Sequence, residues 1–213
     1  MLLVPGDPRR RDDRPPMRHL SLIRSFHVAD FLTLANGACG MTAVLYALAY
    51  ASGGRHGGLA IAAGLVVLAL VFDVCDGRVA RWRQEHSVLG RELDSLADLV
   101  SFGVAPAAIA FAAGLDTWPD AVVLVFFVLC GLSRLARYNV TADALSARHG
   151  RVTHFEGTPI PTSVVPLGIL MWGVAQDAMW GLRWGDTWLH ALVLPYAVSG
   201  CLMVSRTLRI PKP

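Results

Sequence analysis

Six long apolar stretches, separated by short polar connections, make up most of this sequence. An apolar run of about 20 residues is long enough to cross the hydrocarbon core of a membrane as a helix. The pattern therefore predicts an all-α integral membrane protein with six transmembrane helices. The expected spans are residues 31–52, 59–79, 93–113, 120–138, 160–176 and 188–205.

The segment before the first expected span is polar. Residues 1–19 are rich in Pro and Arg and contain no hydrophobic run of the kind found in a secretory signal peptide. We interpret them as a flexible basic cytoplasmic tail. Residues 20–28 (LSLIRSFHV) predict a short interfacial helix, and residues 20–213 are expected to form one six-helix membrane domain.

Composition agrees with this pattern. Apolar residues make up 54% of the chain and charged residues 16%, and the mean hydropathy is +0.48, values typical of a polytopic membrane protein. The net charge of +3 is small, so no nucleic-acid partner is expected. All 19 basic residues except Arg55 and Arg183 fall on one side of the expected spans. By the positive-inside rule, both termini and the second connection are expected in the cytoplasm.

Four aspartates interrupt the apolar pattern around the second connection, in the run DVCDGRVARWRQEHSVLGRELDSLAD that begins at Asp73 and ends at Asp98. A carboxylate at membrane depth is costly unless it is paired, hydrated or bound to a cation. Helical spacing gives the two flanking helices one polar face each. The faces carry Asp73, Asp76, Gly77, Ala80 and Arg81 on the first helix, and Gly90, Asp94 and Asp98 on the second.

Converging carboxylates suit a hard divalent cation, which prefers oxygen ligands and in turn holds phosphates. The residues alone therefore predict a metal-phosphate site at the cytoplasmic edge of a membrane. An interhelical polar clamp and an ion pathway are the alternatives, because both also place acids inside membranes.

The spacing Asp73-x2-Asp76-Gly77-x2-Ala80-Arg81-x8-Gly90-x3-Asp94-x3-Asp98 resembles the signature of the CDP-alcohol phosphatidyltransferases. The resemblance implies that Asp73, Asp76, Asp94 and Asp98 hold divalent cations, two per site. Mg²⁺ or Mn²⁺ is expected, with Ca²⁺ as a further candidate. It also implies that Asp98 is the general base. The residues that it assigns to nucleotide and phosphate binding are Asn36, Gly77, Ala80, Arg81 and Gly90.

Two further stretches, residues 94–106 (DSLADLVSFGVAP) and 134–139 (RLARYN), resemble the phosphatidylserine synthase branch of that family. They imply that Ser101, Gly103, Arg134 and Arg137 bind the acceptor alcohol. Helix packing through small residues is the alternative for Ser101 and Gly103, and interfacial snorkelling is the alternative for the arginines. Thr158, Thr162 and Ser163 depart from the branch toward polarity.

The implied reaction moves a phosphatidyl group from CDP-diacylglycerol to the hydroxyl of an alcohol, with release of CMP. L-serine is the favoured acceptor. Glycerol 3-phosphate and inositol phosphate are alternatives, and a non-enzymatic cation carrier is a remote one. The expected setting is the cell inner (cytoplasmic) membrane, with membrane lipids as neighbours and a homodimer as the assembly. The loop at 177–187, with Trp180 and Trp184, predicts an aromatic belt at the outer interface.

Overall fold

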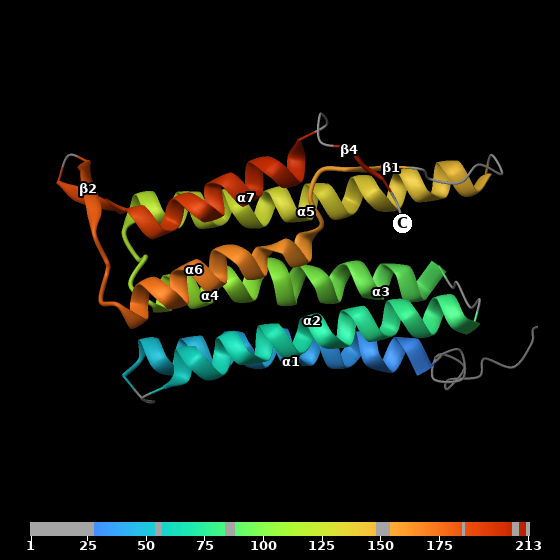
Figure 1. The fold of residues 1–213 in the computed structure, drawn as a ribbon, viewed down its shortest axis with the longest axis horizontal. Helices are drawn as coiled ribbons and strands as arrows, with labels where there is room; N and C mark the ends of the chain where they lie inside the picture. Colours follow the sequence, from blue (N-terminus) through green and yellow to red (C-terminus); the bar gives the residue numbers. More distant parts are fainter. Residues whose placement is uncertain are drawn as a thin grey trace, which may run out of the picture.

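The computed structural model describes residues 28–53, 57–83, 88–147, 154–184, 186–205 and 209–211. The basic tail predicted for residues 1–19 and most of the interfacial helix predicted for residues 20–28 lie outside them. The described chain is mostly helical, and its helices run side by side along one long axis (Figure 1).

The elements follow the apolar pattern closely. The helical ones are α1 (Val28–Ala51), α2 (Gly58–Arg83), α3 (Val88–Asp98), the π-helix η2 (Leu99–Val104), α4 (Ala105–Ala112), α5 (Trp118–Ala147), the 3-10 helix η3 (Ile160–Ser163), α6 (Val164–Ala175), the 3-10 helix η4 (Ala191–Val193) and α7 (Leu194–Val204). The strands are β1 (His154–Glu156), β2 (Gly181–Trp184), β3 (Thr187–His190) and β4 (Arg209–Pro211).

Four helical segments are long and apolar enough to cross a membrane: Asp30–Ala51, Gly58–Val79, Leu89–Ala112 and Trp118–Thr141. Two shorter apolar segments, Ile160–Ala175 and Ala191–Val204, follow. The last is shorter than predicted because residues 187–190 are the strand β3, and α7 begins only at Leu194 with a proline in its first turn. The fold is thus a helical membrane protein with two small strand pairs that the sequence did not indicate.

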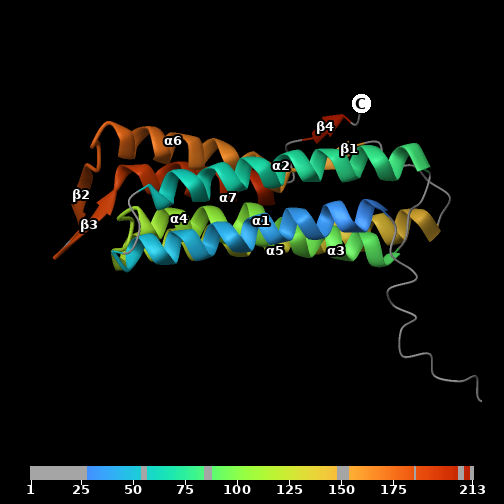
Figure 2. The same cartoon turned by 90° about the horizontal axis from the view of Figure 1, so that it is seen from below.

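Small residues let the first two helices pack closely. Ala43 and Ala47 of α1 and Ala62 and Ala69 of α2 are completely buried, and α1 runs along α2 for much of its length (Figure 2). Such residues let helix backbones approach closely in a membrane. On the other side of the bundle α5 packs along α7, where Phe127 and Tyr196 meet edge to face with ring centroids 5.3 Å apart.

The third expected span is one continuous rod made of α3, η2 and α4 (Figure 1). Its middle widens into a π-helix, in which the Ala105 N–H donates to the carbonyl of Val100. We attribute the π-helix to Pro106, the residue after Ala105. Pro106 has no N–H, and its ring would clash with the carbonyl four residues earlier in a regular α-helix. The wider turn relieves that clash directly after Asp98.

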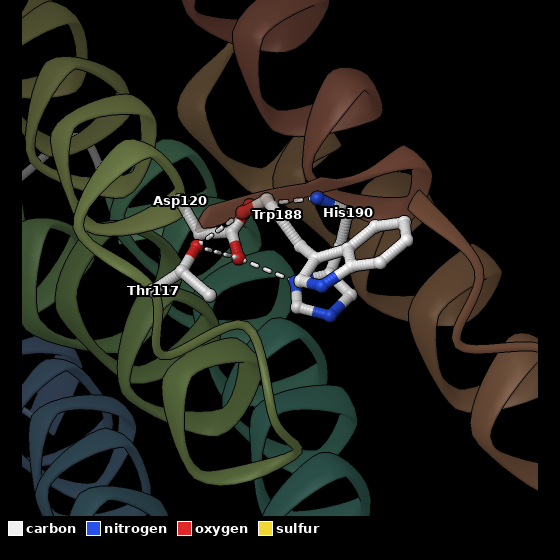
Figure 3. A network of polar contacts seen from close by, with 4 residues as sticks. All are labelled: Thr117, Asp120, Trp188 and His190. Atoms are coloured by element: carbon white, nitrogen blue, oxygen red, sulfur yellow. Dashed lines mark hydrogen bonds and ion pairs between the residues drawn. The ribbon is translucent and has the colours of Figure 1, made fainter. Parts of the chain in front are cut away.

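The two ends of the bundle differ. One end, called the acid end here, carries Asp73, Asp76 and Asp94. There α2 finishes, α3 begins, and α5 extends beyond α7 (Figure 1). At the opposite, hairpin end, β2 pairs antiparallel with β3, with Gly181 opposite His190. A polar cluster fastens this hairpin to the start of α5 (Figure 3). Asp120 there accepts hydrogen bonds from Thr117 Oγ1 at 2.7 Å, from the His190 backbone N–H at 3.0 Å and from His190 Nδ1 at 2.6 Å.

Candidate active site

Three carboxylates converge at the acid end, as the helical spacing predicts. Asp73 and Asp76 come from the second half of α2 and Asp94 from α3, and one oxygen of each lies within 4.8 Å of the others. Asp76 is buried, and Asp73 and Asp94 are half-buried. Three like charges this close repel each other strongly unless a cation lies among them.

Helix α1 supports the acids from the side. Thr33 Oγ1 donates a hydrogen bond of 2.8 Å to Asp76 Oδ2. One turn later, Asn36 Nδ2 donates a hydrogen bond of 3.1 Å to Asp98 Oδ1. Both donors are buried. Because Thr33 and Asn36 share one face of the helix, α1 holds two of the four acids at once.

Glycines in α1 make this approach possible. A Cβ at Gly37 would lie 3.4 Å from the Cβ of Ala97 on α3, and one at Gly40 would overlap Ser101 of η2. Ser101 Oγ in turn donates a hydrogen bond of 2.9 Å to the backbone carbonyl of Asn36. The backbone of α1 is therefore pinned to η2 at the residue that contacts Asp98.

Asp98 is set apart from the other acids. It is buried but does not belong to the group of three whose oxygens lie within 4.8 Å. Its charge nevertheless interacts with those of Asp73 and Asp94, and with the half-buried guanidinium of Arg134 on α5. The charge of Arg134 also interacts with that of Asp73, so Arg134 supplies a positive charge that acts on the acids.

The donor set at the acid end fits a divalent cation. Its ligands are carboxylate oxygens, which Mg²⁺, Mn²⁺ and Ca²⁺ prefer. Asp94 Oδ1 is buried and has no hydrogen-bond partner within the described residues. A buried acceptor without a partner is costly, and coordination of a cation would remove that cost. Asp73, Asp76 and Asp94 are the residues that would hold it.

Of the residues predicted to bind nucleotide, Gly77 lies on α2 and Gly90 on α3, the two helices that carry the acids. A Cβ added at Gly77 would meet nothing within 4 Å, so this face of α2 is open to a ligand. Gly90 lies on α3 one turn before Asp94. The side chains of Ala80 and Arg81 lie outside the described part. The amide nitrogen of Asn36 is hydrogen-bonded to Asp98, and nucleotide binding by Asn36 stays a prediction.

The residues predicted to bind the acceptor have distinct surroundings. Ser101 is occupied by the Asn36 carbonyl, and Gly103 packs near Leu99 and Ile160. Both contacts match the helix-packing alternative, and acceptor binding by these two residues stays a prediction. Arg137 Nη2 makes a long hydrogen bond of 3.5 Å to the carbonyl of Met203 at the end of α7. The Nε atoms of Arg134 and Arg137 are buried without partners in the described chain.

Two further contributions were missed by the sequence analysis. Thr33 lies three residues before Asn36, so its position on the same helical face was an available signal. The second is a network between α3 and α5. There Ser95 Oγ donates to Asn139 Oδ1 at 3.1 Å, and Asn139 Nδ2 donates to Glu92 Oε2 at 3.2 Å. It fastens α3 to α5 beside the acids.

Comparison with known proteins agrees with this geometry. The family model for CDP-alcohol phosphatidyltransferase matches residues 26–198. The chain belongs to the CDP-alcohol phosphatidyltransferase family. It is 42% identical over 208 residues to a CDP-diacylglycerol--serine O-phosphatidyltransferase of Saccharomyces cerevisiae, covering 92% of this chain and 74% of that protein.

Other relatives carry similar names. A CDP-diacylglycerol--serine O-phosphatidyltransferase of Mycobacterium bovis is 34% identical over 171 residues, which cover 79% of this chain and 55% of the relative. The chain thus spans about half the length of that protein. An archaetidylserine synthase of Methanothermobacter thermautotrophicus is 36% identical over 141 residues, covering 65% of this chain and 54% of the relative.

Proposed function

We propose that this protein is a phosphatidylserine synthase. It transfers the phosphatidyl group of CDP-diacylglycerol to the hydroxyl of L-serine and releases CMP. The observation that carries the proposal is the convergence of Asp73, Asp76 and Asp94 beside a separately held Asp98. Relatives named for serine transfer over most of the chain favour serine over glycerol 3-phosphate and inositol phosphate. Membership of a transferase family disfavours the cation carrier.

The acids divide into two roles in this proposal. Asp73, Asp76 and Asp94 would hold two Mg²⁺ or Mn²⁺ ions, and Asp98, which lies outside that group, serves as the base. When bound, these ions neutralise the diphosphate and stabilise CMP as the leaving group. Gly77, Ala80 and Gly90 leave room for the cytidine, and Arg81 holds a phosphate. The open space over Gly77 supports a close approach of the nucleotide to α2.

Asp98 carries out the proton transfer. A serine hydroxyl is a weak nucleophile near neutral pH, so a base must take its proton as it attacks. Asp98 accepts that proton, and the serine oxygen forms a bond to the lipid-bearing phosphorus. The bond from that phosphorus to the bridging oxygen breaks, and CMP leaves with the electron pair. The position of Asp98, next to the three acids but outside their group, supports this assignment.

The arginines of α5 recognise the acceptor. A guanidinium matches the planar carboxylate of an amino acid with two parallel donors. Arg134 and Arg137 lie one turn apart, and each has an Nε without a partner in the described chain. Thr158 supports this proposal through the end of α7, because its backbone N–H donates to the Leu202 carbonyl, next to the Met203 carbonyl that Arg137 contacts. The hydroxyl of Thr158 is likewise buried without a described partner.

We also propose six membrane crossings, with the acid end facing the cytoplasm of a cell inner membrane. The distribution of basic residues supports the orientation. Arg183 lies on β2 at the hairpin end, so Arg183→Cys in a cysteine-free background should react with a membrane-impermeant maleimide applied to intact cells. Labelling only after lysis would show that the hairpin end faces the cytoplasm, opposite to the proposed orientation. The homodimer stays a prediction, which cross-linking in native membranes would test.

The decisive experiment is a reconstitution with defined acceptors. Purified protein receives labelled CDP-diacylglycerol and Mn²⁺ or Mg²⁺, with L-serine, glycerol 3-phosphate or inositol phosphate in parallel. Of the three acceptors, only serine should give a lipid product, and phosphatidylserine and CMP should then form in equal amounts. Excess EDTA should stop turnover. Asp98→Asn is the matched variant, expected to bind CDP-diacylglycerol but to lose most turnover. A lipid product with another acceptor and none with serine would overturn the assignment.

A further inference from the structure

Asn36 contacts the proposed base and not the acids that gather around the cation site. Its Nδ2 lies 3.1 Å from Asp98 Oδ1, and the two residues are 62 positions apart in the chain. The side chain of Asn36 is completely buried. Because an ionised carboxylate only accepts hydrogen bonds, the amide nitrogen must point at Asp98, which fixes the orientation of the amide group.

The backbone of Asn36 is held as firmly as its side chain. Ser101 Oγ donates to the Asn36 carbonyl at 2.9 Å, and Gly40 leaves no room for any side chain between α1 and Ser101. Ser101 lies in the π-helix that begins one residue after Asp98. The same short stretch of the third rod therefore supplies the carboxylate and the hydroxyl that hold Asn36.

The unused half of the amide argues against a purely structural clamp. Asn36 Oδ1 is buried and has no hydrogen-bond partner within the described residues. A buried acceptor without a partner destabilises the fold, so a clamp selected for stability alone would satisfy both ends of the amide. The geometry favours a side chain whose donor is committed to Asp98 at a cost to the fold.

We propose that Asn36 is a positioning residue for Asp98. Its amide holds one carboxylate oxygen so that the other faces the hydroxyl of the acceptor. This inference rests on the proposed function, because it takes Asp98 as the base. It differs from the nucleotide-binding role that the family resemblance implies for Asn36, and the two roles affect different kinetic constants. A nucleotide contact governs the KM for CDP-diacylglycerol, whereas orientation of the base governs kcat.

The test compares two residues on the same face of α1. Asn36→Ala removes the contact to Asp98, and Thr33→Val removes the contact to Asp76 one turn earlier. Asn36→Ala should lower kcat about 10- to 100-fold, since misplacement of a reacting group by about 1 Å has effects of this size. Its KM for CDP-diacylglycerol should stay within about twofold of the wild-type value. Thr33→Val should instead raise the Mn²⁺ concentration needed for half-maximal activity, which Asn36→Ala should leave unchanged.

A second variant separates position from stability. Asn36→Gln keeps an amide donor on a side chain one methylene longer and should regain part of the kcat that Asn36→Ala loses, even when both have the same unfolding midpoint in detergent. The proposal is overturned if Asn36→Ala keeps the wild-type kcat, if it changes only the KM for CDP-diacylglycerol, or if the glutamine and alanine variants have equal kcat at equal unfolding midpoints. A wild-type protein that makes no phosphatidylserine would refute the proposed function instead.

Discussion

Both ends of the bundle bury carboxylates, yet they treat them in opposite ways. At the hairpin end, the fully buried Asp120 receives the Thr117 hydroxyl and both the backbone and the ring N–H of His190 (Figure 3). At the acid end, three carboxylates face one another, and Asp94 Oδ1 has no partner in the described chain. Asp120 is saturated with donors, whereas one oxygen of Asp94 has none in the described chain.

The difference separates a structural acid from a functional one. A buried charge is tolerated when hydrogen bonds replace its lost water, and Asp120 meets that condition within the fold. It also lies in the first turn of α5, where the helix dipole favours a negative charge. Asp94 does not meet that condition within the described chain. A cation bound among Asp73, Asp76 and Asp94 would offset their repulsion, and this makes the acid end the candidate active site.

The largest expected effect comes from removing one of the unsatisfied acids. Asp94→Ala should lower phosphatidylserine formation by at least about 10²–10³-fold, because charge stabilisation of the transition state depends on it. In EDTA its unfolding midpoint should equal or exceed that of the wild type, since one repelling charge is gone. A clear drop of the midpoint in EDTA would show that Asp94 stabilises the fold and would weaken the comparison.

The second largest effect is expected on stability, because cation binding should raise the free energy of unfolding of the wild-type protein. At a Mn²⁺ concentration about 100 times the dissociation constant, linkage gives about 2.7 kcal/mol. The unfolding midpoint in detergent should therefore rise with Mn²⁺ or Mg²⁺ for the wild type and for Asp120→Ala, and much less for Asp94→Ala. An equal rise in all three proteins would place the bound cation elsewhere.

Asp120, unlike Asp94, should affect stability and not activity. Asp120→Ala leaves the backbone N–H and the ring N–H of His190 without their acceptor, whereas the Thr117 hydroxyl keeps the Trp188 carbonyl, so the free energy of unfolding should fall by about 1–3 kcal/mol. The midpoint should fall in EDTA and in Mn²⁺ alike, while kcat of the folded fraction stays near the wild-type value. A change in the Mn²⁺ requirement would contradict a purely structural role for Asp120.

The parts of the site that the sequence could predict are those set by local helical spacing. Asp73 and Asp76 lie three residues apart on one helix, so their shared face follows from the helical period, and the motif with Asp94 predicts their convergence. The support of these acids could not be predicted in the same way. Thr33 and Asp76 are 43 residues apart, and the meeting of α1 with α2 depends on packing of small residues along the whole helix pair.

The fold was predictable to a similar depth. Apolar runs located the helices, because their length in lipid is a physical requirement. The runs did not reveal that the third rod widens at Leu99–Val104, since this depends on how Pro106 is accommodated. They also did not reveal β2 and β3, whose pairing depends on the fastening of His190 to Asp120. Short strands at a membrane interface have no hydrophobic period long enough to detect.

The smallest expected effect concerns the arginines of α5, and it tests how far the contrast between satisfied and unsatisfied groups extends. Arg137 has one donor on the Met203 carbonyl, while its Nε is buried without a described partner. If that unused donor binds the serine carboxylate, Arg137→Lys keeps the positive charge but cannot donate to both the Met203 carbonyl and the carboxylate.

We expect the KM for serine to rise about three- to tenfold in Arg137→Lys, the effect of one hydrogen bond of about 0.5–1.5 kcal/mol. The KM for CDP-diacylglycerol should not change, and kcat should fall less than the serine KM rises. Arg134→Lys is the matched control one turn earlier. Because the charge of Arg134 interacts with those of Asp73 and Asp98, this substitution should act mainly on kcat. If Arg137→Lys leaves the serine KM unchanged, the guanidinium only caps the end of α7, and recognition of the carboxylate must fall to Arg134 alone.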